Sequence, residues 1–155
     1  MPAGLLDGLR VLDLGAGISA PWCAKILADY GAEVIKVEPP GSGDASRNMG
    51  PFAGDDPDPE KSLSFLYLNT NKKGVTLDPS TVTGRKLFDR LLDDADVLVH
   101  DSPPAKAKEL GLDYEILAQV NPGLVVTSIA PFGQTRPYKD FEATDIVTYA
   151  PSGLM

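Results

Sequence analysis

The sequence has little cysteine, little positive charge and no long hydrophobic run, and each shortage excludes a class of protein. Cys23 is the one cysteine, so no disulfide forms within the chain, and we expect a cytoplasmic protein in which this thiol is a small core residue. The formal net charge of −8 provides no basic face for nucleic acid. No apolar run approaches the ~20 residues of a membrane-spanning helix. We therefore expect neither nucleic acid nor a membrane as a partner, and we predict no metal site.

Short aliphatic runs alternate along the chain with apolar residues at helical spacing. The runs predict strands at residues 9–14, 34–37, 75–77, 97–99 and 124–128. The helical spacing predicts helices from Pro21 to a cap at Gly31, and at residues 81–93, 104–110 and 114–120, with a further helix near the end. This alternation is typical of an α/β fold, a doubly wound, mainly parallel Rossmann-like sheet with helices on both faces. A ligand is expected at the carboxyl ends of the strands.

Two of these helices carry apolar stripes. Trp22, Ile26, Leu27 and Tyr30 recur at helical intervals in the first, and the helix at 81–93 has Leu87, Phe88, Leu91 and Leu92 on one face. Residues 41–62 have no period and many glycines and prolines. A segment of that length without secondary structure is uncommon in a compact domain unless it has a function or wraps around the rest.

The turn in "VLDLGAGISAP" at residues 11–21 fits two interpretations. Asp13, Gly15 and Gly17, together with Glu38 after the next strand, fit a methyltransferase that binds S-adenosylmethionine, with the acid on the ribose. However, Ser19 stands at the third small position, and Pro21 lacks a backbone donor. In the second interpretation the turn only reverses the chain close to the sheet. These residues leave both open.

Longer segments resemble one family in order. The segment "APWCAKILADYGAEVIKVEPPGSGD" resembles the opening of the class III CoA-transferases, the group of formyl-CoA transferase, carnitine CoA-transferase and α-methylacyl-CoA racemase. Four further segments match in the same order: "NTNKKGVTLD", "ADVLVHDSPP", "LGLDYEILAQVNPGLVVTSIAPFGQ" and "TDIVTYAPSGLM". This resemblance favours the CoA-transferases over the methyltransferases.

The resemblance implies an activity and a domain organisation. Members move coenzyme A from an acyl-CoA to a carboxylic acid through a mixed anhydride on an enzyme aspartate. CoA is thus a substrate, and no tightly bound cofactor is expected. Residues 1–155 correspond to the N-terminal, CoA-binding-type domain of a longer enzyme, and the nucleophilic aspartate follows Met155 in the family pattern. We therefore expect these residues alone to be inactive, and the full-length protein to form an interlocked homodimer.

The resemblance also implies binding residues. The positions that match CoA contacts are Ala16, Gly17, Ile18, Ser19, Leu77, Asp101, Ser102 and Leu110. Asp145 is expected to be a structural helix residue. Thr144 replaces the histidine of racemase-like members, which argues against racemisation.

The chain departs from the family pattern where basic or donor residues are expected. Pro39 and Glu109 replace basic residues, and His100 with Asp101 replaces the usual Glu-Asn pair. Lys72, Lys73 and Arg47 remain as cations, each expected to be a solvated surface residue, and His100 a strand-end residue. These losses make a second hypothesis necessary, a non-catalytic CoA-transferase-like module of a fused or hetero-oligomeric enzyme. A methyltransferase is the third.

Overall fold

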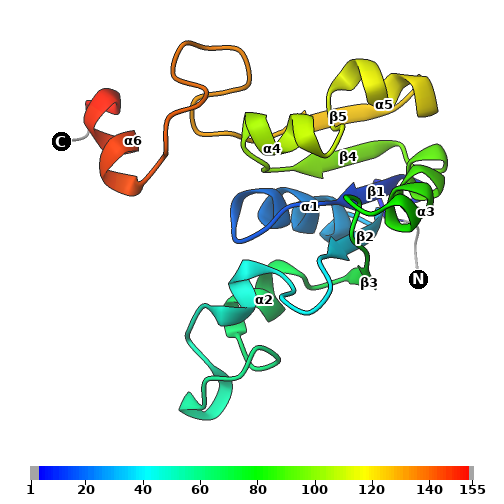
Figure 1. Ribbon diagram of the computed structural model, residues 1–155. Coiled ribbons are helices and arrows are strands. Elements are labelled where there is room, and N and C mark those ends of the chain that lie inside the picture. The colour runs from blue at the N-terminus through cyan, green and yellow to red at the C-terminus, as the bar shows by residue number, and fades with distance from the viewer. Residues whose placement is uncertain (1–3, 154–155) are drawn as a thin grey trace.

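A computed structural model describes residues 4–153, which form one parallel sheet with helices packed against it (Figure 1). The strands lie in the order β3-β2-β1-β4-β5. Their bounds are β1 Arg10–Asp13, β2 Glu33–Glu38, β3 Lys72–Thr76, β4 Val97–His100 and β5 Val125–Ser128. The helices are α1 Ser19–Asp29, α2 Leu63–Leu68, α3 Val82–Asp93, α4 Pro104–Glu109, α5 Tyr114–Val120 and α6 Asp145–Ser152. Two 3₁₀ helices, η1 Ala45–Asn48 and η2 Ala53–Asp55, lie between β2 and α2.

Every strand pair in this sheet is parallel, which confirms the predicted fold class. In β1, Val11 pairs with Val34 of β2 on one side and with Val97 of β4 on the other. The strand order changes direction at β1, because β2 and β3 lie on one side of it and β4 and β5 on the other. The carboxyl ends of β1 and β4 therefore border the place where such sheets bind ligands.

Each face of the sheet has its own hydrophobic core, because strand side chains alternate between faces. Val11, Val34 and Val99 pack against the alanines of α1 on one face. Leu12 and Leu98 point to the other face, where Phe88 and Leu92 of α3 and Leu117 of α5 cover them. Helices thus cover both faces, as predicted.

The buried side of α1 differs from the predicted apolar stripe. Ala20, Ala24 and Ala28 face the sheet, whereas Trp22, Ile26 and Tyr30 are exposed. Small side chains let α1 approach the sheet closely, so the large apolar residues lie on the outer side. The ring of Trp22 lies 5.8 Å from that of Tyr67 in α2.

Three other differences concern element boundaries. β3 begins at Lys72 and ends at Thr76, so Leu77 lies just beyond the strand that was expected to include it. Helix α2 was not predicted. Its N-cap is Ser62, whose hydroxyl accepts a hydrogen bond from the amide of Phe65 at 3.1 Å. Residues 41–62 are not without structure, because η1 and η2 lie within them.

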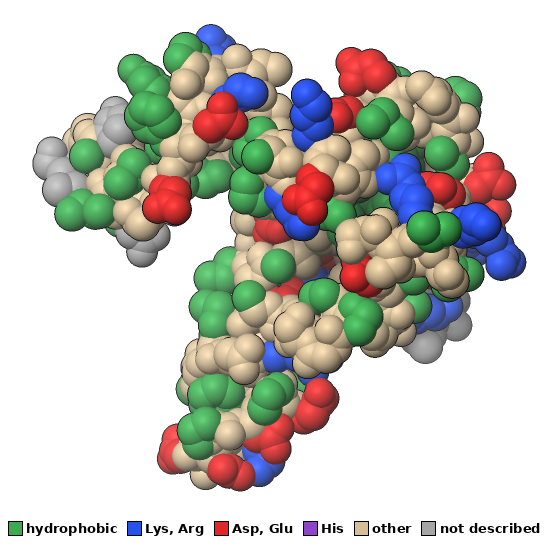
Figure 2. All heavy atoms as spheres, in the orientation of Figure 1, with side chains coloured by type: hydrophobic (Ala, Val, Ile, Leu, Met, Phe, Trp, Pro, Cys, Tyr) green, Lys and Arg blue, Asp and Glu red, His purple; other side chains and the backbone are tan. Residues whose placement is uncertain are grey.

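The last described segment leaves the sheet. After β5 the chain forms a loop and then α6, which lies apart from the other helices in Figure 1. Figure 2 shows an open hollow between this arm and the lobe formed by the residues between β2 and β3. Gly153 ends α6 with a positive φ of 76°. The last two residues of the "SGLM" motif lie outside the described residues.

Helix α3 provides a test of the packing. Phe88 is fully buried and Leu87 is 44% exposed, although both belong to the predicted stripe. We expect Phe88→Ala to lower the free energy of unfolding by about 3–5 kcal/mol, because it leaves a cavity in the core. Leu87→Ala is the matched control and should cost less than about 1.5 kcal/mol, since much of its side chain already contacts water. Urea unfolding of both variants measures the difference, and equal losses would contradict this placement of α3.

Candidate functional site

The glycine turn between β1 and α1 is held by carboxylates from three parts of the chain. Asp13 of β1 accepts a hydrogen bond from the amide of Gly15 at 3.0 Å. Asp44, which precedes η1, accepts one from the amide of Gly17 at 2.9 Å. Asp101, directly after β4, accepts one from the amide of Ala16 at 2.9 Å. The turn is thus fixed by side chains that are far apart in the sequence.

Asp101 also caps α1. Its Oδ2 accepts hydrogen bonds from the Ser19 hydroxyl at 3.1 Å and from the amide of Ala20 at 3.3 Å. The helix has no cap of its own, because Ile18 is the N-cap residue and no acidic residue lies in the first turn. A carboxylate at this end satisfies free amides and interacts favourably with the helix dipole.

Two glycines give the turn its shape. A Cβ on Gly15 would lie 2.3 Å from the Cβ of Ala20, so no side chain fits there. Gly17 has a φ of 77°, in the left-handed region that favours glycine. The turn therefore lies directly against the start of α1.

Below the turn lies a buried cluster of four charges, formed by Asp13, Lys36, Asp44 and Lys72. The Nζ of Lys72 lies 2.7 Å from Oδ2 of Asp13, and the Nζ of Lys36 lies 2.6 Å from Oδ2 of Asp44. Lys36 also donates a hydrogen bond to the carbonyl of Gly15. The side chains of all four are at most 2% exposed. The two opposite pairs compensate one another inside the protein.

The surroundings of this buried charge cluster shift two pKa values. Burial lowers the pKa of Lys72 below its ordinary value, although the charge of Asp13 opposes the shift. Burial alone would raise the pKa of Asp44, but the charge and hydrogen bond of Lys36, with the hydrogen bonds from Ser46, lower it below its ordinary value. Asp44 therefore remains an anion that holds the turn.

Glu38, the acid that a ribose would need, is already engaged. Its carboxylate pairs with the guanidinium of Arg47 through contacts of 2.7 and 2.9 Å. It also accepts a hydrogen bond from the amide of Asp44 at 2.9 Å. The hydrogen bonds from Arg47 lower the pKa of Glu38. Arg47 also contacts Glu60 and lies over the ring of Phe65. Glu38 thus fixes the loop after β2, which removes the main support for a methyltransferase site.

A cavity of about 940 Å³ opens at the carboxyl ends of β1, β4 and β5. Four of the predicted CoA contacts line it: Ala16, Ser19, Asp101 and Ser102. Much of the remaining wall comes from the Pro103–Pro104 corner and from the segment after β5, which includes Phe132 and Phe141. The wall is mainly apolar, with acidic side chains at Asp101, Asp140 and Glu142.

The other predicted contacts are not all at this cavity. Gly17 and Ile18 lie in the same turn but do not line it. Leu77 is buried in the core beside α3, and Leu110 packs against that core at the end of α4. The structure thus brings together the turn and the Asp101–Ser102 loop, whereas both leucines belong to the core that α3 covers.

The prediction that Lys72, Lys73 and Arg47 are solvated is wrong for two of them. Lys72 is buried against Asp13, and Arg47 is largely buried against Glu38. Lys73 is exposed but lies at the amino ends of the strands, where its Nζ contacts Glu33 at 2.6 Å. None of the three is free to contact an anion at the carboxyl-end cavity.

His100 is the last residue of β4, as predicted, but it is buried. It is 1% exposed, and its Nδ1 has no hydrogen-bond partner among the described residues. Burial lowers the pKa of this imidazole, against a smaller opposing effect of the Asp101 charge. Cys23 is partly buried against the α1 core, and burial raises the pKa of its thiol. Neither group has the environment of a reactive side chain.

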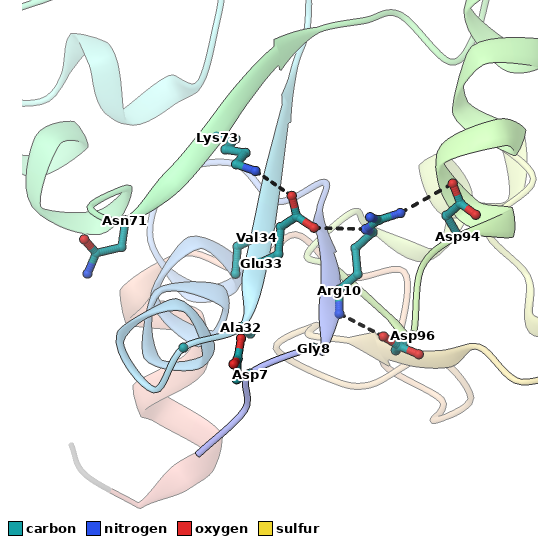
Figure 3. A pocket seen from close by; sticks show the side chains of 11 residues that line it. Asp7, Gly8, Arg10, Ala32, Glu33, Val34, Asn71, Lys73, Asp94 and Asp96 are labelled. Carbon is teal, nitrogen blue, oxygen red and sulfur yellow. Dashed lines mark hydrogen bonds and ion pairs between the residues drawn. The ribbon is translucent and has the colours of Figure 1, made fainter. Parts of the chain in front are cut away.

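A second cavity, of about 720 Å³, lies at the opposite, amino ends of the strands (Figure 3). Figure 3 shows Arg10 between Glu33 and Asp94, with Lys73 on the other side of Glu33. The charges here satisfy one another on an exposed surface. Parallel sheets bind ligands at the other end, so this cavity is not the candidate site.

Sequence reasoning missed the buried charge cluster. Lys36 stands in the middle of the aliphatic "VIKVE" strand, and a lysine within a buried strand requires a buried anion. That signal was available, but its partner Asp44 lies in the loop for which no structure was predicted.

Among residues 4–153 no helix is long and apolar enough to cross a membrane. In the same part of the chain, no three or more histidine, cysteine or acidic side chains gather where a metal ion could bind.

Comparison with known proteins gives one consistent result. The model of CoA-transferase family III matches residues 6–155. The chain is 40% identical over 154 residues to an acetyl-CoA:oxalate CoA-transferase of Acetobacter aceti, covering 99% of this chain and 38% of that protein. It is 42% identical over 155 residues to a succinyl-CoA–D-citramalate CoA-transferase of Chloroflexus aurantiacus, covering 99% and 37%.

A solved structure agrees. The crystal structure of a CAIB/BAIF family protein from Brucella suis superposes with a TM-score of 0.86 at 36% identity, covering 99% of this chain and 40% of that one. The chain thus spans about two fifths of the length of the relatives that it matches.

The two neighbouring lysines of β3 test the buried charge cluster. We expect Lys72→Met to lower the free energy of unfolding by about 3–5 kcal/mol, because it leaves Asp13 as a buried charge without its close partner. Lys73→Met removes an exposed ion pair one residue away and should cost less than about 1 kcal/mol. Chemical unfolding at neutral pH compares the two, and a Lys72→Met protein as stable as Lys73→Met would refute the arrangement.

His100 predicts a pH dependence. Burial lowers the pKa of His100 in the folded state. As the pH falls through the ordinary value of 6.5, the unfolded chain therefore takes up a proton that the folded chain does not, and the free energy of unfolding decreases. We expect His100 to account for a loss of up to about 1.4 kcal/mol between pH 7.5 and 5.5. His100→Leu should lack that part of the loss in unfolding measured at both pH values. If wild type and variant lose equal stability over this range, the imidazole is not kept neutral by burial.

Proposed function

The chain belongs to CoA-transferase family III, and from that membership we propose that it forms the CoA-binding α/β part of an acyl-CoA:carboxylate CoA-transferase. The observation that carries the proposal is the carboxyl-end cavity. It lies where parallel sheets bind ligands, and the turn and the Asp101–Ser102 loop line it together. Its largely apolar wall suits the uncharged arm of a CoA thioester better than a free sugar or a metal ion.

The proposed reaction follows from the relatives' names and the family resemblance. An acyl-CoA and a carboxylic acid are the substrates, and no tightly bound cofactor is needed. A carboxylate of the enzyme attacks the thioester carbonyl, forming a mixed anhydride and releasing the CoA thiolate. The family pattern has this aspartate after the "SGLM" segment, so the residues described here hold and orient CoA rather than perform the attack.

The proposed CoA contacts are the eight positions predicted from the sequence. Ala16, Ser19, Asp101 and Ser102 have the best support, because they line one cavity. Gly17 and Ile18 adjoin it. Leu77 and Leu110 would have to contact the ligand from the edge of the α3 core, so their direct contact has the least support.

A second copy of the chain remains the proposed protein partner, in the cytoplasm. The exposed outer side of α1 and α2 supports this, because Trp22 and Ile26 with Leu66 and Tyr67 form an apolar surface on neighbouring helices. Isolated apolar side chains are common on monomers, but grouped ones mark contact surfaces.

One observation favours the second candidate, a non-catalytic module that supports assembly. Every cation that the sequence offered for CoA phosphates is paired with an acid of the chain itself. The cavity wall contains a single cation among its described residues, Lys139, and that lysine lies 3.7 Å from Asp140. Weak or absent CoA binding would support this alternative.

Ligand titration tests the proposal. We expect calorimetry to detect binding of CoA and weaker or no binding of S-adenosylmethionine, because Glu38 is occupied by Arg47. Ala105→Trp should weaken CoA binding at least about tenfold, since a large side chain at the cavity wall takes the ligand's space. Asp94→Trp is the matched control, because it fills the amino-end cavity instead and should leave the affinity unchanged.

Three results would count against the proposal. Tighter binding of S-adenosylmethionine than of CoA would restore the methyltransferase hypothesis. Loss of CoA binding in Asp94→Trp but not in Ala105→Trp would move the site to the amino ends. No CoA binding by the wild-type chain would favour the non-catalytic module.

A further inference from the structure

In many nucleotide-binding sheets the first glycine turn presents free backbone amides, and a phosphate of the ligand accepts their hydrogen bonds. In this chain the corresponding amides already have acceptors. Gly15 donates to Asp13, Gly17 to Asp44, and both Ala16 and Ala20 to Asp101. Carboxylates of the protein occupy the places that phosphate oxygens take elsewhere.

From this arrangement we propose that Asp101 determines which part of a ligand can contact the turn. Its carboxylate excludes phosphate, so that only an uncharged part of the ligand contacts the turn. That the ligand is CoA rests on the proposed function, but the exclusion of phosphate does not. In a bound CoA thioester, the amide-containing arm would lie over the turn and the phosphates would lie away from it.

Three of the contacts that hold the turn belong to Asp101 alone. One carboxylate oxygen accepts the Ala16 amide at 2.9 Å, and the other accepts the Ser19 hydroxyl at 3.1 Å and the Ala20 amide at 3.3 Å. A phosphate would have to displace these hydrogen bonds and then remain close to the displaced carboxylate. Both the lost charged hydrogen bonds and the repulsion of like charges oppose that exchange.

The rest of the cavity does not compensate. Asp140 and Glu142 add negative charge to its wall, and Lys139, the one cation that lines it in the described residues, is paired with Asp140. Arg47, Lys36 and Lys72 are each paired with a carboxylate. An amide or a hydroxyl group meets no such repulsion and can donate a hydrogen bond to the outer lone pairs of Asp101.

Inorganic diphosphate is the direct probe, because it has the charge of the CoA linkage without the adenosine or the thioester. We would titrate the whole 155-residue chain at low ionic strength and follow the backbone amides by NMR. In the wild type we expect no saturable shift at Ala16, Gly17 or Ala20. In Asp101→Asn, which keeps the shape but loses the charge, we expect these amides to shift, with diphosphate bound at least about tenfold more tightly.

Glu142→Gln is the matched control, because it removes one negative charge from the same cavity, leaves the Lys139–Asp140 pair intact and does not touch the turn. It should behave like the wild type, which separates the blocked amides from the overall negative charge. If Asp101→Asn does not fold, Asp101→Ser and the wild-type titration still test whether Asp101 excludes diphosphate from the turn.

Several outcomes overturn the proposal. Saturable shifts of Ala16, Gly17 or Ala20 in the wild type would show that the carboxylates do not exclude phosphate. Equal gains in Glu142→Gln would assign the effect to net charge, and no gain in any folded Asp101 variant would contradict the proposed role of Asp101. None of these readouts depends on CoA, so a failure of the proposed function appears in the CoA titration and a failure of this inference appears here.

Discussion

Two lysines and two aspartates buried under a single turn are the constraint on which the rest of this edge of the sheet depends. Asp13, Lys36 and Lys72 come from the three neighbouring strands β1, β2 and β3, and Asp44 comes from the loop after β2. Removing any one leaves an uncompensated charge inside the protein, which is far more costly than losing a surface ion pair. The pairing register of the three strands and the path of the loop therefore depend on one another. The glycine turn, which both aspartates also contact, has one conformation as a result.

That constraint decides what the turn can do. A glycine turn is open to two uses: a flexible loop whose amides receive an anion, or a rigid one whose amides are already satisfied. Here the second holds, because Asp13, Asp44 and Asp101 take four amides between residues 15 and 20. Asp101, one of these acids, also lines the neighbouring cavity, whose other acidic side chains are Asp140 and Glu142. Stability of the turn and affinity for a polyanion are thus opposed in this chain.

Features that depend on residues close together in the sequence could be predicted, whereas features that depend on distant residues could not. The strands and most helices followed from aliphatic runs and 3.6-residue spacing, since each run had to be buried on a sheet of this class. Helix α1 was placed correctly, but its buried side was not. The large apolar residues were expected to face the sheet, whereas the alanines do so because their small side chains allow closer packing. Lys72 and Arg47 were expected in solvent, because their partners, Asp13 and Glu38, are 59 and 9 residues away and no spacing rule joins them. The same holds for the site. The turn and the loop after β4 were identified from segments that match the family, whereas the ion pairs that hold the turn join residues distant in the sequence and could be seen only in the structure.

One departure from the family pattern, Asp101, has a physical explanation in this structure. By the family resemblance, Pro39 and Glu109 stand in place of basic residues and Asp101 in place of an asparagine, and Asp101 and Glu109 lie between the end of β4 and the end of α4. Asp101 alone makes three hydrogen bonds to the start of α1, so in this chain an acid there serves a structural purpose that a neutral amide fulfils less fully. Once the acid caps the helix, the amides of the turn are no longer available to a phosphate, so under the proposed function the phosphates of CoA would be recognised away from the turn.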